Sequence, residues 1–537
     1  MLTTDTPKLD PISLEVIWTR LISIIDEAAL TLHRTSFSTV VRESHDYSCM
    51  VLAPDGQSIA QATRSIPSFI GTLPLSVNAF TNKYPLETLH PGDVIVSNDP
   101  WIGTGHLPDL TIAAPIFFHG QLVGFAGAIA HMADIGGRRR APDNKDIYEE
   151  GLQIPVLKLF DAGKPNETLF DIIRQNVRVP VEVTGDIHAM VGACAHMAAG
   201  VATLLDEYKL PDMVELTRKF TGLTEAAMRE AITDIPDGTF DATTYIDSFD
   251  SSTPLMMECS ITVHGDELVV DFAGSSPQNR SPLNSVLSYT RAYSAYALKC
   301  VLSPDIPNND GSFRPITVTA PEGCFLNPVY PAAVEARATV GHYCTSAVFN
   351  TLAKVLPMRT PAESGIPLHG FAMSGWQNDQ PFSTIVFYNG GLGARPDADG
   401  LPTLSFPTNV SCTPTEVLER SAPVRILEKT LLPGSGGAGE FRGGLGQRIA
   451  MEVTSSRPVT LAILSQRLNY PPRGRQGGAD GSVERILLNG AQVEGGVPFQ
   501  LHQGDVIVLE LPGGGGFGDI RERSPSALQI DHERGLA

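Results

Sequence analysis

Two short segments of this sequence carry histidine and aspartate at the same spacing, His-x-x-Asp. In NDPWIGTGHLPDL a glycine-containing loop after the apolar run DVIVS presents His106 and Asp109, and in AHMADIGG the end of a second apolar run presents His131 and Asp134. Two imidazoles and one or two carboxylates that converge from neighbouring strand ends suit Zn²⁺, Mn²⁺ or Fe²⁺. No cysteine lies close by in sequence, which favours an open catalytic site over a closed structural one. The same pattern also fits hydrogen-bonded core histidines with aspartates that cap loops.

A third segment, SFSTVVRESHDYSCMV, places two more carboxylates just before a predicted strand. These are Glu43 and Asp46. Either one is suited to completing a metal site or to acting as a general base. The alternative is a pair of acidic residues on the surface.

Other motifs carry less chemistry. The basic run Arg138–Arg140 is suited to an anionic substrate or a partner's phosphate, or is simply a solvated loop. The glycine runs PGSGGAGEFRGGLGQR and LPGGGGFGD lack the Lys-Ser/Thr of a Walker loop and the strand–GxGxxG–helix setting of a dinucleotide site. We expect them to form tight turns where backbones approach closely, with phosphate binding as the alternative. No GxSxG nucleophile elbow is present.

Composition narrows the classes of partner. The formal charge of −20 argues against nucleic acid and anionic membranes, because both need a basic face. The seven cysteines include no CxxC pair, so a reducing compartment is expected. The N-terminus lacks the features of a signal peptide, and no uninterrupted apolar stretch approaches the roughly 18 residues of a membrane span. These features predict a cytoplasmic protein.

The elements that must position the candidate ligands follow from periodicity. Asp10-Pro11 predicts the start of a helix, and Asp55-Gly56 predicts a hairpin turn. The run LTIAAPIFFHGQLVGFAGAIAHMADI predicts two buried strands around a His119-Gly120 turn, and residues 166–229 are predicted to be largely helical. At 537 residues the chain needs several domains.

The predicted fold class is α+β and multidomain, with an N-terminal mixed α/β metal-binding region followed by β-rich middle and C-terminal domains. We place the N-terminal α/β metal-binding catalytic region at residues 1–235. A middle α+β region follows at 236–425, and a glycine-rich β domain with a C-terminal tail covers 426–537.

Several segments together resemble one family. RESHDYS, NDPWIGTGHLPDL, HMADIGG, DIYEEGLQIP, GSGGAGEFRGGLGQR, PPRGRQGG and LPGGGGFGD occur in the order typical of the hydantoinase B/oxoprolinase family and cover nearly the whole chain. That family includes the B subunits of ATP-dependent hydantoinases, lactamases such as caprolactamase, 5-oxoprolinase-type enzymes, and related subunits of acetone and acetophenone carboxylases.

The resemblance implies an activity and a division of labour. It implies a metal-dependent subunit of an ATP-dependent cyclic amidase, acting on a hydantoin, a lactam or 5-oxoproline. A hydantoinase A-type partner would bind ATP and phosphorylate the carbonyl oxygen, and a metal-bound water on this subunit would attack the activated carbon. The expected assembly is a heterotetramer with two copies of each subunit.

By motif, the resemblance also implies site residues. The implied ligands of a Zn²⁺ or Mn²⁺ ion are His106, Asp109 and His131, with Asp46 as a further ligand. Glu43 or Asp46 would take a proton in catalysis, and Asp134 would support a ligand or replace one.

Alternatives remain at this stage. The first is a subunit of an ATP-dependent ketone carboxylase that uses the same metal residues, and the second is a non-catalytic scaffold for the ATPase subunit.

The sequence also departs from the family where relatives often carry histidine in a PxHxG-like stretch, since it reads SIPSFIGTLP. We therefore expect Ser68 and Phe69 to line a less polar substrate pocket.

Overall fold

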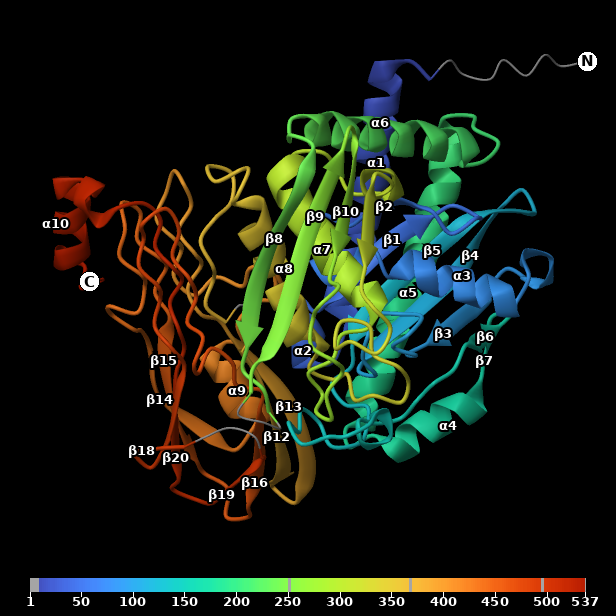
Figure 1. Ribbon diagram of the computed structural model, residues 1–537. Coiled ribbons are helices and arrows are strands. Elements are labelled where there is room, and N and C mark those ends of the chain that lie inside the picture. The colour runs from blue at the N-terminus through green and yellow to red at the C-terminus, as the bar shows by residue number, and fades with distance from the viewer. Residues whose placement is uncertain (1–8, 250–252, 367–368, 494–496, 537) are drawn as a thin grey trace, which may run out of the picture.

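The N-terminal unit is built on a seven-stranded antiparallel sheet. The computed structural model describes residues 9–249, 253–366, 369–493 and 497–536, and this sheet lies on the right in Figure 1. Its strand order is β2-β1-β5-β4-β3-β6-β7. The strands are β1 (Tyr47–Leu52), β2 (Ser58–Gln61), β3 (Val94–Ser97), β4 (Asp109–Phe118), β5 (Gln121–His131), β6 (Leu157–Asp161) and β7 (Lys164–Pro165). The predicted hairpins β1–β2 and β4–β5 are confirmed, with Gly56 and His119-Gly120 at positive φ in their turns.

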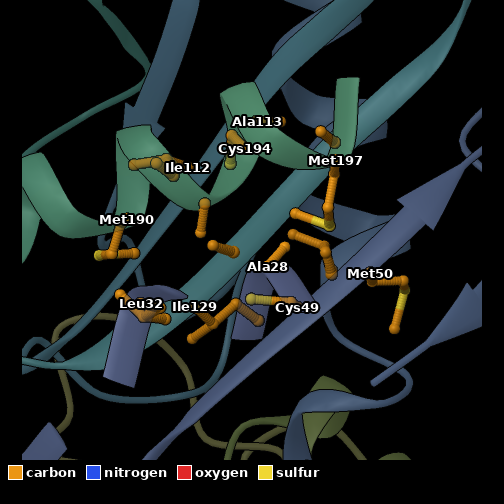
Figure 2. Close-up of a cluster of buried hydrophobic side chains, with 14 of the residues drawn as sticks. Ala28, Leu32, Cys49, Met50, Ile112, Ala113, Ile129, Met190, Cys194 and Met197 are labelled. Atoms are coloured by element: carbon orange, nitrogen blue, oxygen red, sulfur yellow. The ribbon is translucent and has the colours of Figure 1, made fainter. Parts of the chain in front are cut away.

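Helices surround this sheet. They are α1 (Pro11–Thr35), α2 (Thr39–Arg42), α3 (Leu73–Lys83), α4 (Glu167–Asn176), α5 (Pro180–Glu207) and α6 (Val214–Thr233). The predicted start of α1 is confirmed, because the Asp10 carboxylate accepts hydrogen bonds from the backbone N–H groups of Ile12 and Ser13, both at 3.0 Å. Figure 2 shows apolar side chains from α1 and α5 meeting those of β1, β4 and β5. This core holds the ends of β4 and β5 in place.

Helix α5 differs from the sequence expectation in one respect. It is long and apolar enough, by length and composition, to cross a membrane, and it is the one such helix in the described part of the chain. It packs against α1 and β4 with buried residues along its length, which is the position of a core helix. Its composition is therefore weak support for a membrane span.

The middle unit is a four-stranded sheet with two long helices packed together. Its strand order is β11-β10-β9-β8, with β10 and β11 parallel. The elements are β8 (Gly238–Ile246), β9 (Leu255–His264), β10 (Glu267–Asp271), β11 (Ile316–Thr319), α7 (Leu287–Leu302) and α8 (Arg337–Leu352). Helix α8 lies between α7 and strands β8 and β9 and is buried on nearly all sides. Arg337 in its first turn contacts Asp109, the first residue of β4 in the seven-stranded sheet.

The C-terminal unit, on the left in Figure 1, consists of two sheets that share one apolar core. One sheet has the order β13-β12-β16-β19 and the other β14-β15-β20-β17-β18. The first comprises β12 (His369–Gln377), β13 (Gln380–Tyr388), β16 (Val459–Ile463) and β19 (Phe499–Leu501), and the second β14 (Val424–Leu431), β15 (Gln447–Val453), β17 (Arg485–Leu488), β18 (Ala491–Gln492) and β20 (Val506–Glu510). Two short helices complete it, α9 (Thr415–Ser421) and α10 (Pro525–Glu533).

The placement of β12 and β13 bears on the predicted domain boundary at residue 425. Both strands precede that residue, yet β12 pairs with β16 of the C-terminal unit from Phe371 to Ser374. The boundary predicted at 425 therefore divides a sheet. The predicted boundary at 235 falls between α6 and β8.

The glycine runs pack backbone against backbone, as their composition predicted. A Cβ atom on Gly443 would lie 1.9 Å from the carbonyl oxygen of Gly514, and one on Gly391 would lie 1.8 Å from that of Gly444. Only glycine permits such approaches.

Short 3₁₀ turns connect these elements. They are η1 (Pro67–Phe69), η2 (Leu86–Thr88), η3 (Ile147–Glu149), η4 (Asp310–Phe313) and η5 (Ile520–Glu522).

Candidate metal centre

The two His-x-x-Asp segments meet at one end of the seven-stranded sheet. Asp109 opens β4, His131 closes β5, and the two residues are directly opposite in the register of this antiparallel pair. His106 lies in the loop just before β4. Asn98 shapes this loop, because its side-chain amide donates to the carbonyl of Leu107 at 2.8 Å.

Gly105 brings the same loop against the middle unit. It has a φ of +91°, and a Cβ atom there would lie 2.9 Å from Val286 and 3.0 Å from the side chain of Arg337. A larger residue would therefore push His106 away from α8.

The three predicted ligands form one compact, buried cluster. Within the described ranges, His106, Asp109 and His131 are the one group of three such side chains whose ligand atoms all lie within 4.8 Å of one another. Asp109 Oδ1 is 2.7 Å from His106 Nε2 and 2.9 Å from His131 Nδ1. All three residues are at most 3 % exposed. Solvent is therefore a poor competitor for these atoms.

Their electrostatic setting favours the protonation states that bind metal. Burial and the neighbouring charge on Arg337 lower the pKa of His106 to about 3, and burial lowers that of His131 to about 4. Burial opposes ionisation of Asp109, but the charge on Arg337 and the contacts with both histidines hold its pKa well below the usual range. At neutral pH the cluster presents two neutral imidazoles and one carboxylate, which are the forms that coordinate a cation.

The contacts of His106 show that this donor set fits a cation. Two acceptors, Asp109 Oδ1 and Glu335 O, lie 2.7 and 3.3 Å from its two ring nitrogens, while the Arg337 Nη2 donor lies 2.7 Å from Nε2. A neutral imidazole has one N–H and cannot satisfy all three. A cation held by Nε2 and Asp109 would leave Nδ1–H to donate to Glu335 O, an arrangement common among metal-bound histidines. The buried Nε2 of His131 has no hydrogen-bond partner and offers a further ligand atom.

Sequence reasoning missed Arg337, at the first turn of α8. Its guanidinium donates to Asp109 Oδ2 and to His106 Nε2, and it stacks on the ring of Tyr289 with its carbon 3.9 Å from the centroid. The side chain is 4 % exposed. Arg337 is 228 positions from Asp109 and sits in PAAVEARATVGHYC, which has no local motif. The one available signal was a charged residue at the start of an otherwise apolar helix.

Asp46 lies beside this cluster. It immediately precedes β1, and its carbonyl accepts a hydrogen bond from His131 N at 3.1 Å, while its carboxylate Oδ2 is 3.9 Å from His131 Nδ1. Burial and the charge on Asp109 raise the pKa of the Asp46 carboxyl to about 7. Glu43, three residues earlier, ends α2, and its charge acts on His33 and His45. The structure therefore brings Asp46, and not Glu43, to the side of the cluster.

Asp134 lies outside the group of three. Its buried carboxylate accepts from the Arg178 guanidinium at 2.8 Å and from Gly136 N at 3.3 Å. These contacts fix the loop that follows His131. They place Asp134 in a position that supports the loop.

Ser68 and Phe69 form η1 and are almost fully buried. Ser68 lies close to the hydroxyl groups of Tyr289 and Tyr293, so it borders the side of the centre where Arg337 is stacked. Phe69 packs in the core of the N-terminal unit.

Comparison with known proteins identifies the family of this chain. The family model of hydantoinase B/oxoprolinase matches residues 10–520. The chain is 30% identical to the B subunit of a putative D-/L-hydantoinase from Pseudomonas sp. (strain NS671), over 99% of this chain and 94% of that protein. It is also 30% identical to the beta subunit of caprolactamase from Pseudomonas jessenii, over 98% and 94%. The chain is also 30% identical to 5-oxoprolinase of Dictyostelium discoideum, and the alignment covers 96% of this chain and 41% of that longer protein.

Two solved structures share the fold. The crystal structure of ATP-dependent caprolactamase from Pseudomonas jessenii matches with a TM-score of 0.89 and 27% identity, covering 99% of this chain and 95% of that one. Acetone carboxylase matches with a TM-score of 0.85, covering 99% of this chain and 79% of that one, but at 19% identity this likeness extends to the fold alone. The predicted multidomain α+β fold is confirmed. On the family match and these full-length relatives, the chain belongs to the hydantoinase B/oxoprolinase family.

Proposed function

We propose that this chain is the metal-carrying subunit of an ATP-dependent enzyme that hydrolyses a cyclic amide, with His106, Asp109 and His131 as the ligands. The observation that carries the proposal is the buried set of two neutral imidazoles and one ionised carboxylate within 4.8 Å. Two full-length relatives are named as subunits of a hydantoinase and of a caprolactamase, and these names support a cyclic amide as the substrate.

The donor set is compatible with either Zn²⁺ or Mn²⁺. Such a cation, when bound, acts as a Lewis acid and lowers the pKa of a coordinated water toward neutrality. The protein residues supply the rest of the chemistry. Glu335 O orients His106, Asp109 carries the negative charge of the site, and the surrounding apolar core keeps bulk water away.

Asp46 is our candidate for the general base. Its pKa of about 7 allows it to hold a proton at one step and release it at another near neutral pH. Its Oδ2 atom is 3.9 Å from His131 Nδ1, so it lies close enough to the ligands to exchange a proton with a group bound there. We propose Asp46 as a base and not as a fourth ligand, because its carboxylate is not part of the compact group of three ligands.

The proposal assigns ATP chemistry to another chain. An amide carbonyl is a poor electrophile, and phosphorylation of its oxygen would make the carbon open to attack by water. This sequence has no Walker loop, so we place ATP binding and phosphorylation on a hydantoinase A-type partner, in a complex with two copies of each subunit in the cytoplasm. The hydantoinase and caprolactamase relatives are themselves named as single subunits of their enzymes, which supports a partner of this kind.

Ketone carboxylation is the second candidate, because acetone carboxylase shares the fold. The chain can be purified with the ATPase-type subunit encoded beside it and assayed for ATP consumption with lactams, hydantoins and 5-oxoproline, and separately with ketones plus bicarbonate. We expect ATP-dependent opening of a cyclic amide. Bicarbonate-dependent consumption of a ketone, without hydrolysis of any cyclic amide, would overturn the hydrolase assignment.

The same assay distinguishes a catalytic subunit from a scaffold without chemistry of its own. Asp109→Asn keeps the shape of the side chain but loses its charge. If the complex turns over a cyclic amide at the wild-type rate with this variant, the centre is not catalytic.

A further inference from the structure

A second polar cavity lies where the loop after β5 meets the C-terminal unit. It has a volume of about 240 Å³, enough for several water molecules or a small oxyanion. One wall is the loop segment from Gly137 to Ala141, and the opposite wall is formed by strands β12, β13 and β16, with the hydroxyl groups of Ser374, Ser383 and Thr460. No carboxylate residue lines it.

The guanidinium of Arg139 lines this cavity with part of its hydrogen-bonding capacity unused. Its Nη1 donates to Ser383 Oγ at 2.8 Å, which fixes the plane of the group. Its Nε and Nη2 are buried and have no hydrogen-bond partner, and the side chain is 5 % exposed. Nε–H and Nη2–H lie on the same edge of a guanidinium and form the fork that binds two oxygens of a carboxylate or phosphate.

The neighbouring charges leave this fork available. Arg138 pairs with Asp143 at 2.7 Å on the surface, and Arg178 pairs with Asp134 at 2.8 Å. Asp134 Oδ1 is 4.0 Å from Arg139 Nε, too far for a hydrogen bond. Asp134 is therefore shared between two arginines and hydrogen-bonded to only one of them.

Glu182 and Glu335 also act on Arg139 through their charges. Burial raises the pKa of Glu182 to about 7, so this group is only partly ionised near neutral pH. The Glu335 carboxylate accepts a hydrogen bond from Arg140 N at 2.7 Å. Neither carboxylate lines the cavity, and the ion pair of Arg139 with Asp134 is long at 4.0 Å, so the positive charge of Arg139 is only partly balanced.

The cavity is linked to the metal centre by a short path. Arg140, next to Arg139, donates its backbone N–H to the carboxylate of Glu335, whose carbonyl lies 3.3 Å from His106 Nδ1. The loop that ends in the arginine run begins at His131 itself. An anion held by Arg139 would lie behind the loop that carries a metal ligand.

We propose that this cavity is an oxyanion site in which the guanidinium of Arg139 binds a phosphoryl or carboxylate group of a reactant, assisted by the hydroxyl groups of the strand wall. The assignment to a reactant rests on the proposed function. In that reaction the oxyanion has two possible sources. One is the phosphoryl group, carried by the activated amide and then released as phosphate, and the other is a carboxylate on the substrate.

Titration of the full-length chain with inorganic phosphate, followed by isothermal calorimetry, tests the site itself. We expect Arg139→Gln to weaken phosphate binding by about tenfold to a hundredfold, because it removes a charge-assisted hydrogen bond. Ser383→Ala keeps the charge but frees Nη1 from its anchor, and should weaken binding to a smaller degree. Arg138→Gln is the matched control, since that guanidinium lines the same cavity but is paired with Asp143, and it should leave the affinity within about twofold.

Turnover by the complex with its ATPase partner distinguishes the two possible sources of the oxyanion. 5-Oxoproline and 2-pyrrolidinone share a lactam ring, and only the first has a carboxylate. If the site binds the phosphoryl group, Arg139→Gln slows both substrates by the same factor. If it binds the carboxylate, the KM for 5-oxoproline alone rises.

Failure of the site and failure of the proposed function give different results. Phosphate that does not bind the wild-type chain, or binds Arg139→Gln equally well, overturns the oxyanion site and means that the cavity holds only water. A wild-type complex that hydrolyses no cyclic amide overturns the proposed function, while the phosphate titration still decides the cavity.

Discussion

Asp109 and His131 are directly opposite one another in the register of β4 and β5, and their side chains meet with Asp109 Oδ1 2.9 Å from His131 Nδ1. The hairpin therefore brings together two residues that are 22 positions apart in sequence. Because packing against a buried core fixes the register of paired strands, the site depends on the core in Figure 2 as much as on the ligands themselves.

Removal of Arg337 should strengthen metal binding. Its guanidinium contacts both His106 Nε2 and Asp109, so it repels a cation and competes for the ligand atoms. We expect Arg337→Met to raise the affinity for Zn²⁺ or Mn²⁺ by about tenfold or more, measured by competition with a chelator. A fall in affinity would mean that Arg337 instead holds Asp109 in its binding position.

Asp46→Asn should separate proton transfer from metal binding. We expect the metal content to stay at the wild-type level and kcat to fall by about 10²–10⁴-fold, the range for loss of a general base. Metal analysis and turnover of the same preparation make the comparison. Loss of metal together with activity would show that Asp46 is a ligand.

Gly443→Ala should destabilise the C-terminal unit. The new Cβ would lie 1.9 Å from the Gly514 carbonyl oxygen, and the backbones must separate at a cost of about 1–3 kcal/mol or more. Gly222→Ala is the matched control, since this exposed position in α6 has open space and should gain about 0.5–1 kcal/mol from helix propensity. Thermal melts of the two variants should shift in opposite directions. Equal shifts would contradict the close packing of the glycine segments.

Glu182→Gln should stabilise the protein with a defined pH dependence. Burial and the charge on Asp186 raise the folded-state pKa of Glu182 from 4.5 to about 7, while the charge on Arg139 acts in the opposite direction. The folded chain therefore holds this proton more tightly than the unfolded chain, so stability is lost as the pH rises from about 4.5 to 7.

The glutamine variant avoids that loss. Its melting temperature should match wild type near the unfolded-state pKa of 4.5 and exceed it by a few degrees at a pH above the folded-state value of about 7, measured by thermal melts across the range. Glu207→Gln, at the exposed end of the same helix, should show no such divergence. A Glu182→Gln advantage that does not grow with pH would contradict the raised pKa.

Local patterns were enough to predict much of the fold. The capped start of α1, the hairpins β1–β2 and β4–β5 and the long helices of residues 166–229 follow from caps, turns and periodicity, and all are confirmed. The pairing of β12 with β16 joins Phe371 to Ile463 and has no local signal. The predicted boundary at residue 425 rests on local composition, which carries no information about this pairing.

The candidate site likewise combines residues that local patterns predicted with residues that they did not. His106, Asp109 and His131 share one hairpin and its preceding loop, so their spacing predicted that they would converge. Arg337 reaches them from α8, and Arg139 faces Ser383 of β13. Contacts between units that are hundreds of residues apart cannot be obtained from spacing in a single sequence.

The metal content of the protein, measured by inductively coupled plasma mass spectrometry after purification with its ATPase partner, tests the central claim most directly. We expect about one divalent cation per wild-type chain, loss of that cation and of turnover in His106→Ala and in His131→Ala, and no change in His119→Asn, whose exposed residue lies in the β4–β5 turn. A wild-type chain without stoichiometric metal, or histidine variants that keep both metal and turnover, would contradict the account.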